Sequence, residues 1–251
     1  MLNTWNEALQ YYREMGDTPI THSYIFRSFF ELVNIDPELK KHRDIVEQQN
    51  LGYGDRPYTF LWKLIVEQLP VGFKFLEIGI FKGATISLVS LLNKRYNKNG
   101  QIYGITPLNP SDDEFSKHDP NCNYEECIQM QYYLNGLDLK DTTIIEGLSN
   151  DPKVLETTFK LIDGLDALYI DGNHDYPVVV NDIRQYTPLL KSGGLLVMDD
   201  ACLDLQIPDG LIRMNWKGME SVTKAVREEL HSNENFEFIF SCGHNKVFRK
   251  K

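Results

Sequence analysis

Cysteine and long apolar runs are both scarce in this sequence. Its four cysteines are Cys122, Cys127, Cys202 and Cys242. They include no C-x-x-C pair and are too few to cross-link a chain of 251 residues, so we expect reduced thiols. No apolar run approaches the length of about 20 residues that crosses a bilayer, so we predict no membrane span.

The start of the chain lacks the uninterrupted apolar core of a secretory signal. Glu7, Arg13 and Glu14 are scattered through residues 1–16, whereas a signal peptide requires an apolar stretch of about 7–15 residues. From these absences we expect a cytoplasmic protein.

An excess of positive charge is also lacking. The chain has 26 Lys and Arg residues against 36 Asp and Glu residues, and its formal net charge is −10. A nucleic acid is bound largely through basic groups that contact its phosphates. The sequence contains no basic stripe of that kind, so we expect no nucleic-acid partner.

The N-terminal part of the chain shows the spacing of amphipathic helices. Two stripes have apolar residues three or four positions apart: Leu2, Trp5, Leu9 and Tyr12, then Phe26, Phe29, Phe30 and Val33. A polar stretch, 36–55, separates them from a third stripe over 58–69, which ends before Pro70. We predict a helical cap over residues 1–55 and one α/β domain over residues 56–251.

Short apolar runs alternate with helical patterns through the rest of the chain. The runs are Phe73–Ile78, Ile102–Ile105, Thr143–Ile145, Ala167–Ile170, Leu195–Met198, Phe236–Phe240 and Lys246–Phe248. This alternation is typical of a parallel sheet with helices on both faces. Only residues 241–245 separate the last two runs, so they should form an antiparallel hairpin. The predicted fold class is α/β, with a doubly wound, mostly parallel, seven-stranded sheet that ends in a hairpin.

The first predicted strand leads through a glycine-containing loop into a helical segment. Glu77, Gly79 and Gly83 form the pattern E-x-G-x-x-x-G. Such a turn brings backbone N–H groups and a helix N-terminus against a ligand, and glycine permits a close approach. The patterns typical of dinucleotide and nucleotide-triphosphate loops are absent. A plain strand-to-helix turn of another α/β protein is the alternative interpretation.

Acidic residues follow two later strands. Asp171 comes directly after the run 167–170, and Asp199 and Asp200 come directly after the run 195–198. A helical crossover joins these runs, so the strands should be parallel neighbours whose carboxyl ends share one ligand-binding edge. Three crowded carboxylates suit a hard cation, Mg²⁺ or Mn²⁺ in its place. Alternatively, Asp199 and Asp200 cap the next segment and Asp171 faces solvent.

These motifs resemble those of class I S-adenosylmethionine-dependent methyltransferases, in which the glycine loop wraps the amino-acid part of the cofactor. Asp199 follows Asp171 by 28 residues, and His174 follows Asp171 by three. This spacing is similar to that of metal-dependent sugar O-methyltransferases of macrolide biosynthesis (the mycinamicin type) and of the cephalosporin hydroxylase-like group. The resemblance covers roughly residues 73–204, and it implies the Rossmann-like methyltransferase fold.

The resemblance also implies site residues. Those for the cofactor are Glu77, Gly79, Gly83, Thr106, Ser149 and Asp171, and those for the metal are Asp171, Asp199 and Asp200. His174 is the implied catalytic base, assisted by Asp171, although a lone histidine is often a structural hydrogen-bonding residue and Asp175 is a second candidate base. Thr106 stands where the family usually has an acid for the ribose, for which Asp112 or Asp113 is the alternative.

Together these features predict an O-methyltransferase that uses S-adenosylmethionine and a divalent metal on a sugar hydroxyl of a glycan or glycosylated natural product. A catechol-type acceptor, a metal-dependent hydrolase or hydroxylase, and a non-catalytic module of a glycan-synthesis assembly are the alternatives. The glycine loop argues against the hydrolase or hydroxylase, and His174 beside three acids argues against the non-catalytic module. Tyr53 and Tyr58 either line a sugar site or pack the cap onto the sheet. The sequence leaves homo-oligomerisation open.

Overall fold

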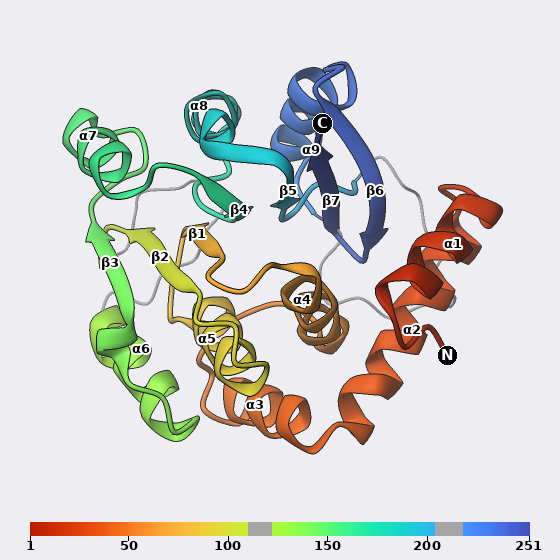
Figure 1. Cartoon of the computed structure of the whole chain (residues 1–251), viewed down its shortest axis with the longest axis horizontal. Helices are drawn as coiled ribbons and strands as arrows, with labels where there is room; N and C mark the ends of the chain where they lie inside the picture. The colour runs from red at the N-terminus through yellow and green to blue at the C-terminus, as the bar shows by residue number, and fades with distance from the viewer. Residues whose placement is uncertain (110–121, 204–217) are drawn as a thin grey trace.

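A seven-stranded sheet forms the centre of the protein (Figure 1). The computed structural model describes residues 1–109, 122–203 and 218–251. The strands are β1 (Lys74–Ile78), β2 (Gln101–Thr106), β3 (Thr142–Glu146), β4 (Leu165–Ile170), β5 (Leu190–Met198), β6 (Phe236–Cys242) and β7 (Asn245–Lys250). Their order in the sheet is β3-β2-β1-β4-β5-β7-β6. The first five are parallel, and β7 runs antiparallel to both β5 and β6. The predicted fold class, including its terminal hairpin, is confirmed.

Helices cover both faces of this sheet. They are α1 (Trp5–Met15), α2 (Pro19–Ile35), α3 (Pro37–Gln48), α4 (Arg56–Gln68), α5 (Ala84–Arg95), α6 (Tyr124–Leu134), α7 (Pro152–Leu161), α8 (Tyr176–Tyr186) and α9 (Glu220–Val226). In Figure 1, α7, α8 and α9 lie above the sheet, and α4, α5 and α6 lie below it. Successive strand residues face opposite sides. Phe75 therefore packs in the core between the sheet and helices α4 and α5, whereas Leu76 packs in the core between the sheet and helices α8 and α9.

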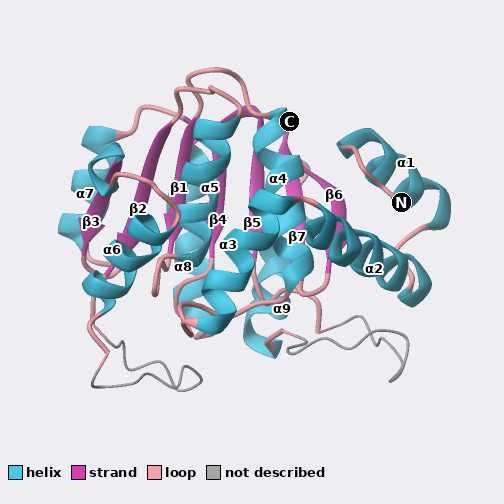
Figure 2. Cartoon of the chain, turned by 90° about the horizontal axis from the view of Figure 1, so that it is seen from below, coloured by secondary structure: helices cyan, strands magenta, loops and turns pink. Residues whose placement is uncertain are grey.

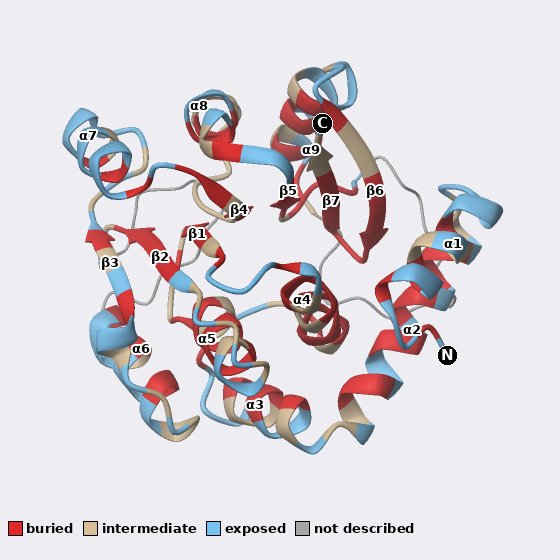
Figure 3. Cartoon of the chain, viewed as in Figure 1, coloured by how far each residue is buried: buried red, intermediate tan, exposed pale blue. Residues whose placement is uncertain are grey.

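The N-terminal helices begin at residues that satisfy their free backbone N–H groups. The side chain of Thr4 accepts a hydrogen bond from the backbone of Glu7, and the Glu7 side chain accepts in return. Asp36 caps α3, and Pro37 occupies its first turn. This helix lies in the stretch 36–55 that we interpreted only as a polar separation. Its buried face is narrow and largely polar, so apolar spacing gave no signal. Figure 3 shows how much of it faces solvent.

The cap helices share a core with the sheet. Phe29 of α2 and Phe60 of α4 have ring centroids 5.1 Å apart, and both belong to the same buried cluster as Phe75. Phe30, from the predicted apolar stripe, is instead 39% exposed. The division of the chain between residues 55 and 56 stays a prediction. In the ranges that the structure describes, no helix is both long and apolar enough to cross a membrane.

The carboxyl ends of the central strands are held together beyond the last strand residues. The backbone N–H of Gly79 donates to the carbonyl of Ile105 at 2.9 Å, and that of Asp171 donates to Ile78 at 2.9 Å. The chain winds outwards from β1 in one direction and from β4 in the other, so the β1–β4 pair is the topological switch point, where open α/β sheets bind ligands. Figure 2 shows these strands side by side.

Gly104 in β2 leaves room for the loop that follows β1. A Cβ atom at this position would lie 2.4 Å from Cδ1 of Ile80 and 2.8 Å from Cδ1 of Ile86. We expect Gly104→Ala to lower the free energy of unfolding by about 1–3 kcal/mol, because the added methyl overpacks this contact. Urea unfolding measures the effect.

The matched test adds Ile80→Val, which removes the Cδ1 atom nearest the new methyl group. The double variant should be less destabilised than the sum of the two single variants, since the two changes relieve one another. Additive losses would show that Cδ1 of Ile80 is not what makes the added methyl group costly.

Candidate active site

Glycine brings the loop after β1 into direct contact with the loop after β4. Gly79 has φ 95°, and a Cβ atom there would lie 1.9 Å from the carbonyl oxygen of Asp171. No other residue fits this approach. Gly83, with φ 89°, begins α5 as its N-cap. The turn therefore contacts the loop that carries Asp171 at Gly79 and leads into the N-terminus of α5 at Gly83.

Glu77 is a buried carboxylate at the end of β1. It is 2% exposed, and its Oε2 atom has no hydrogen-bond partner among the described residues. Burial, with the negative charge of Asp199, raises the pKa of Glu77 well above its ordinary value. An unsatisfied buried carboxylate is costly. A cationic group of a ligand at the glycine turn would satisfy it.

The two other predicted cofactor residues differ in their surroundings. Thr106 is buried, and its hydroxyl accepts a hydrogen bond from the backbone of Leu108 at 3.2 Å, so it stabilises the turn after β2. Ser149 lies half-buried after β3, where its carbonyl accepts from the hydroxyl of Tyr186 at 2.6 Å. Asp112 and Asp113 lie outside the described residues. The ribose contact stays a prediction.

The three predicted metal ligands lie at the same edge of the sheet, but among the described residues only Asp199 and Asp200 have ligand atoms within 4.8 Å of one another in a possible metal-binding group, whose third member is His244 and not Asp171. Asp171 accepts a hydrogen bond from the hydroxyl of Tyr169 at 3.1 Å and lies beside Asp199. Burial, with the charges of Asp199 and Asp200, raises the pKa of Asp171 well above its ordinary value. Burial opposes ionisation of Asp199 too, but its pKa is lowered, because His244 and Asp171 favour the charged form more strongly.

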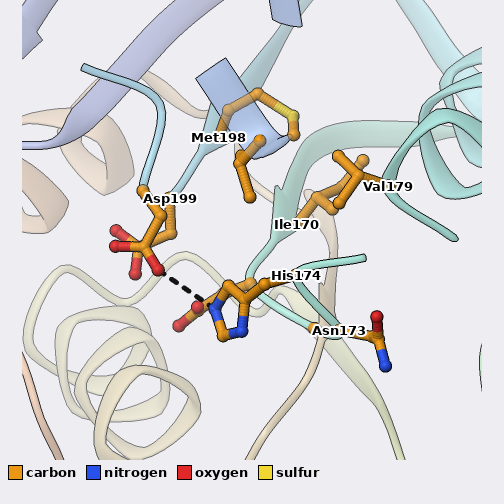
Figure 4. A pocket seen from close by; sticks show the side chains of 10 residues that line it. Ile170, Asn173, His174, Val179, Met198 and Asp199 are labelled. Atoms are coloured by element: carbon orange, nitrogen blue, oxygen red, sulfur yellow. Dashed lines mark ion pairs between the residues drawn. The ribbon is translucent and has the colours of Figure 1, made fainter. Parts of the chain in front are cut away.

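His174 reaches this acid cluster from the loop between β4 and α8. Its Nε2 atom lies 3.0 Å from Oδ2 of Asp200, and its carbonyl oxygen accepts a hydrogen bond from Ser221 of α9 at 2.6 Å. Figure 4 shows this ion pair as a dashed line. The predicted base and the predicted metal ligands therefore form one constellation. Asp175, the second candidate base, lies at the N-cap of α8.

A small pocket opens beside the acids, between the ends of β4 and β5 and the helices α8 and α9. Its lining residues combine an apolar wall with the polar cluster: Ile170, Val179, Met198 and Val222, then Asp171, Gly172, Asn173, His174, Asp199 and Asp200 (Figure 4). Water-excluding walls next to charged groups strengthen electrostatic interactions at the site.

His244 is a member of this site that our sequence analysis missed. It lies in the turn between β6 and β7, and its Nε2 atom is 3.1 Å from Oδ1 of Asp199 and 3.7 Å from Oδ1 of Asp200. The ligand atoms of these three residues lie within 4.8 Å of one another. The hairpin itself was predicted, but the pairing of β7 with β5, which places the hairpin turn at the end of β5, was not.

The two tyrosines considered for the acceptor site have different roles. Tyr58 is only 9% exposed, and its hydroxyl lies 2.9 Å from Nδ1 of His244. Its position agrees with the interpretation that this tyrosine packs the cap onto the sheet. Tyr53 is 71% exposed and stacks on Phe81 of the glycine turn, with ring centroids 5.1 Å apart and planes 11° apart.

Comparison with known proteins decides the family. A family model described as a methyltransferase domain matches residues 76–201, half of the chain. The chain belongs to the methyltransferase family. This methyltransferase is also 30% identical over 126 residues to an uncharacterised protein, R132, of Acanthamoeba polyphaga mimivirus. That match spans half of each protein, so the chain aligns with only half the length of this curated relative.

Solved structures show the same fold for this methyltransferase. A protein from Corynebacterium glutamicum has a TM-score of 0.59 and 18% identity, over 89% of this chain and 94% of that one. TomG, an O-methyltransferase of tomaymycin synthesis from Streptomyces achromogenes solved with S-adenosylmethionine, has a TM-score of 0.57 and 14% identity, over 92% of this chain and 98% of that one. CalS11, a TDP-rhamnose 3'-O-methyltransferase of calicheamicin biosynthesis, has a TM-score of 0.50 and 13% identity, over 93% of this chain and 96% of that one. The predicted methyltransferase fold is confirmed.

Asp182 of α8 should make the stability of this methyltransferase depend on pH. It is 1% exposed, and burial raises its pKa to about 7, an effect that Ser149 and Asn181 only partly oppose. The folded chain thus keeps a proton that the unfolded chain loses above about pH 4. The free energy of unfolding therefore falls as the pH rises from about 4 to 7. The loss is about 1.4 kcal/mol for each unit by which folding raises the pKa of Asp182.

Asp182→Asn keeps a neutral side chain of the same shape at every pH. We expect it to raise the melting temperature relative to the wild type at pH 8, and to do so much less at pH 4. Thermal unfolding at the two pH values measures this difference. The same effect at both values would contradict a buried, titrating Asp182.

Proposed function

We propose that this methyltransferase transfers the methyl group of S-adenosylmethionine to a sugar hydroxyl, with a divalent cation, Mg²⁺ or Mn²⁺, held by Asp171, Asp199 and Asp200. The observation that carries the proposal is the contact between Gly79 and the carbonyl of Asp171. It places a cofactor-type glycine turn and an acid cluster at one switch point, where donor and acceptor have to meet.

The residues at the turn fit the cofactor. The unpartnered, buried Oε2 of Glu77 would carry a negative charge beside the ammonium group of a methionine moiety, because that cation opposes the burial that otherwise raises the pKa of Glu77. Gly79 and Gly83 give the turn its left-handed conformations, and α5 begins there with backbone N–H groups that no side chain caps and that suit a carboxylate. Ser149 and Thr106 complete the proposed cofactor set at the ends of β3 and β2.

The acid cluster fits a hard divalent cation. Burial and the negative charges of Asp199 and Asp200 oppose ionisation of Asp171, so a bound cation would stabilise all three carboxylates in their charged form. Carboxylate oxygens are the ligands that Mg²⁺ and Mn²⁺ prefer. When bound, such a cation lowers the pKa of a hydroxyl that it coordinates and fixes its position.

His174 has the chemistry of the base. A proton on Nε2, the nitrogen that faces Asp200, leaves Nδ1 as the nitrogen that accepts a proton. The ordinary imidazole pKa of about 6.5 suits proton removal near neutral pH. Ser221 holds the backbone of His174 from α9, which limits the positions that the ring can take.

A sugar is the acceptor class that we favour. Neighbouring hydroxyls of a sugar provide two oxygens for one cation, and one structural neighbour, CalS11, bears the name of a rhamnose 3'-O-methyltransferase. A catechol offers the same pair of oxygens and is the second candidate. Mass spectrometry of nucleotide sugars, glycosides and catechols after incubation with the protein and S-adenosylmethionine distinguishes the two classes by which one gains a methyl group.

Removal of the base tests the assigned chemistry. We expect His174→Asn to lower the rate of methyl transfer by about 100-fold or more, because general base catalysis contributes about 10²–10⁴. Cofactor binding should stay within about threefold. Asp175→Asn is the matched control and should retain most of the activity. The proposal for His174 fails if the control loses activity and His174→Asn does not.

Removal of the charge at the turn tests the cofactor site. Glu77→Gln keeps the shape of a protonated glutamic acid but loses the negative charge. Calorimetry with S-adenosylmethionine should show affinity weakened about 10- to 100-fold, since a hydrogen bond between charged groups contributes about 1.5–3 kcal/mol. NAD is the control ligand and should give no heat with the wild type. No heat with S-adenosylmethionine would remove the proposed function.

A further inference from the structure

The tip of the β6–β7 hairpin is built around one tyrosine hydroxyl. A Cβ atom on Gly243 would lie 2.3 Å from the hydroxyl oxygen of Tyr58, so only glycine lets α4 approach the turn this closely. The carbonyl of the next residue, His244, accepts a hydrogen bond from the backbone of Ala201 at 2.8 Å. These contacts fix the His244 ring between Tyr58 and the two aspartates that follow β5.

The hydrogen bonds of Tyr58 determine where its proton goes. The backbone N–H of His244 donates to the hydroxyl oxygen at 3.3 Å, and Nδ1 of the same residue lies 2.9 Å from that oxygen. In the described part of the chain the hydroxyl has no other partner. Since the backbone N–H is always a donor, the hydroxyl proton is directed to Nδ1, which is therefore an acceptor.

This arrangement decides which nitrogen of His244 carries the proton. A neutral imidazole that accepts at Nδ1 is protonated at Nε2. Nε2 is the nitrogen that faces Asp199 and Asp200. To bind a cation there, the ring would have to move its proton to Nδ1. Two N–H groups would then point at the Tyr58 oxygen, and the hydroxyl proton would be left without an acceptor in a buried position, which is costly.

We propose that Tyr58 keeps Nε2 of His244 protonated and thereby disfavours its coordination of a cation, which lowers the affinity of the site for Zn²⁺ and Co²⁺ relative to Mg²⁺ and Mn²⁺. The inference rests on the proposed function for the presence of a cation. An imidazole ligand favours Zn²⁺ and Co²⁺, whereas an all-carboxylate set suits Mg²⁺ and Mn²⁺. Tyr58 is thus a specificity-determining residue that touches neither cation nor substrate.

Metal titration of the full-length, metal-free protein tests this selectivity. Tyr58→Phe keeps the ring that packs on Phe26 and His244 but loses the hydroxyl. Its affinity for Zn²⁺ relative to Mg²⁺ should rise about tenfold, measured by calorimetry with each metal alone. The gain should disappear in the double variant with His244→Gln. The Co²⁺ absorption spectrum should change in Tyr58→Phe, because a nitrogen ligand enters the coordination sphere.

The control is His244→Gln in the wild-type background. Since His244 is not a ligand there, this change should alter the affinities for Zn²⁺ and Mg²⁺ by the same factor, within about threefold. A selective loss of Zn²⁺ affinity would overturn the inference, as would an unchanged Zn²⁺-to-Mg²⁺ ratio in Tyr58→Phe. Thermal unfolding confirms that each variant is folded.

Nitrogen-15 chemical shifts of the histidine rings test the same inference without any metal. The ring whose signals vanish in His244→Gln should be protonated at Nε2, and protonation at Nδ1 would overturn the proposal. A wild-type chain that binds none of these cations would overturn the inference together with the metal part of the proposed function. A selectivity shift without methyl transfer to any acceptor would overturn the proposed function alone.

Discussion

The close approach of Gly79 to the carbonyl of Asp171 is the constraint on which the rest of the site depends. A single methyl group at this glycine would push the loops after β1 and β4 apart, since its carbon would lie 1.9 Å from that oxygen. The backbone hydrogen bond from Asp171 to Ile78 continues the pairing of the two strands to the same point. The distance between the cofactor turn and the acid cluster is therefore set by backbone atoms, which side-chain motion cannot change.

The sheet could be predicted from the sequence because its signals are local. Each of the seven strands lies over a short apolar run, and the crossover between Asp171 and Asp199 has the length that parallel neighbours require. Helix α3 was missed because its buried face is narrow and mixed, with Leu39 and Val46 beside the polar His42 and Arg43. Asp36 followed by Pro37 is typical of the start of a helix, but no apolar residues at helical spacing followed them to support that prediction.

The acids could be predicted for the same reason, but their surroundings could not. Asp171, Asp199 and Asp200 each follow a strand, so strand order alone brings them together. His244 has no such signal, because its place depends on the pairing of β7 with β5 and on Tyr58, which is 186 residues away in the chain. The family match, over residues 76–201, includes neither Tyr58 nor His244. Features of this kind are visible only in the assembled structure.

The contact between Tyr58 and His244 also has a consequence for the order in which the site forms. Bringing together segments so distant in sequence carries a large loop-closure cost, which is repaid only once the intervening sheet is in place. The aspartates after β4 and β5 can therefore be neighbours in a partly folded chain that does not yet have the histidine beside them. Under the selectivity proposed above, discrimination between cations would therefore arise only once the contact between Tyr58 and His244 has formed.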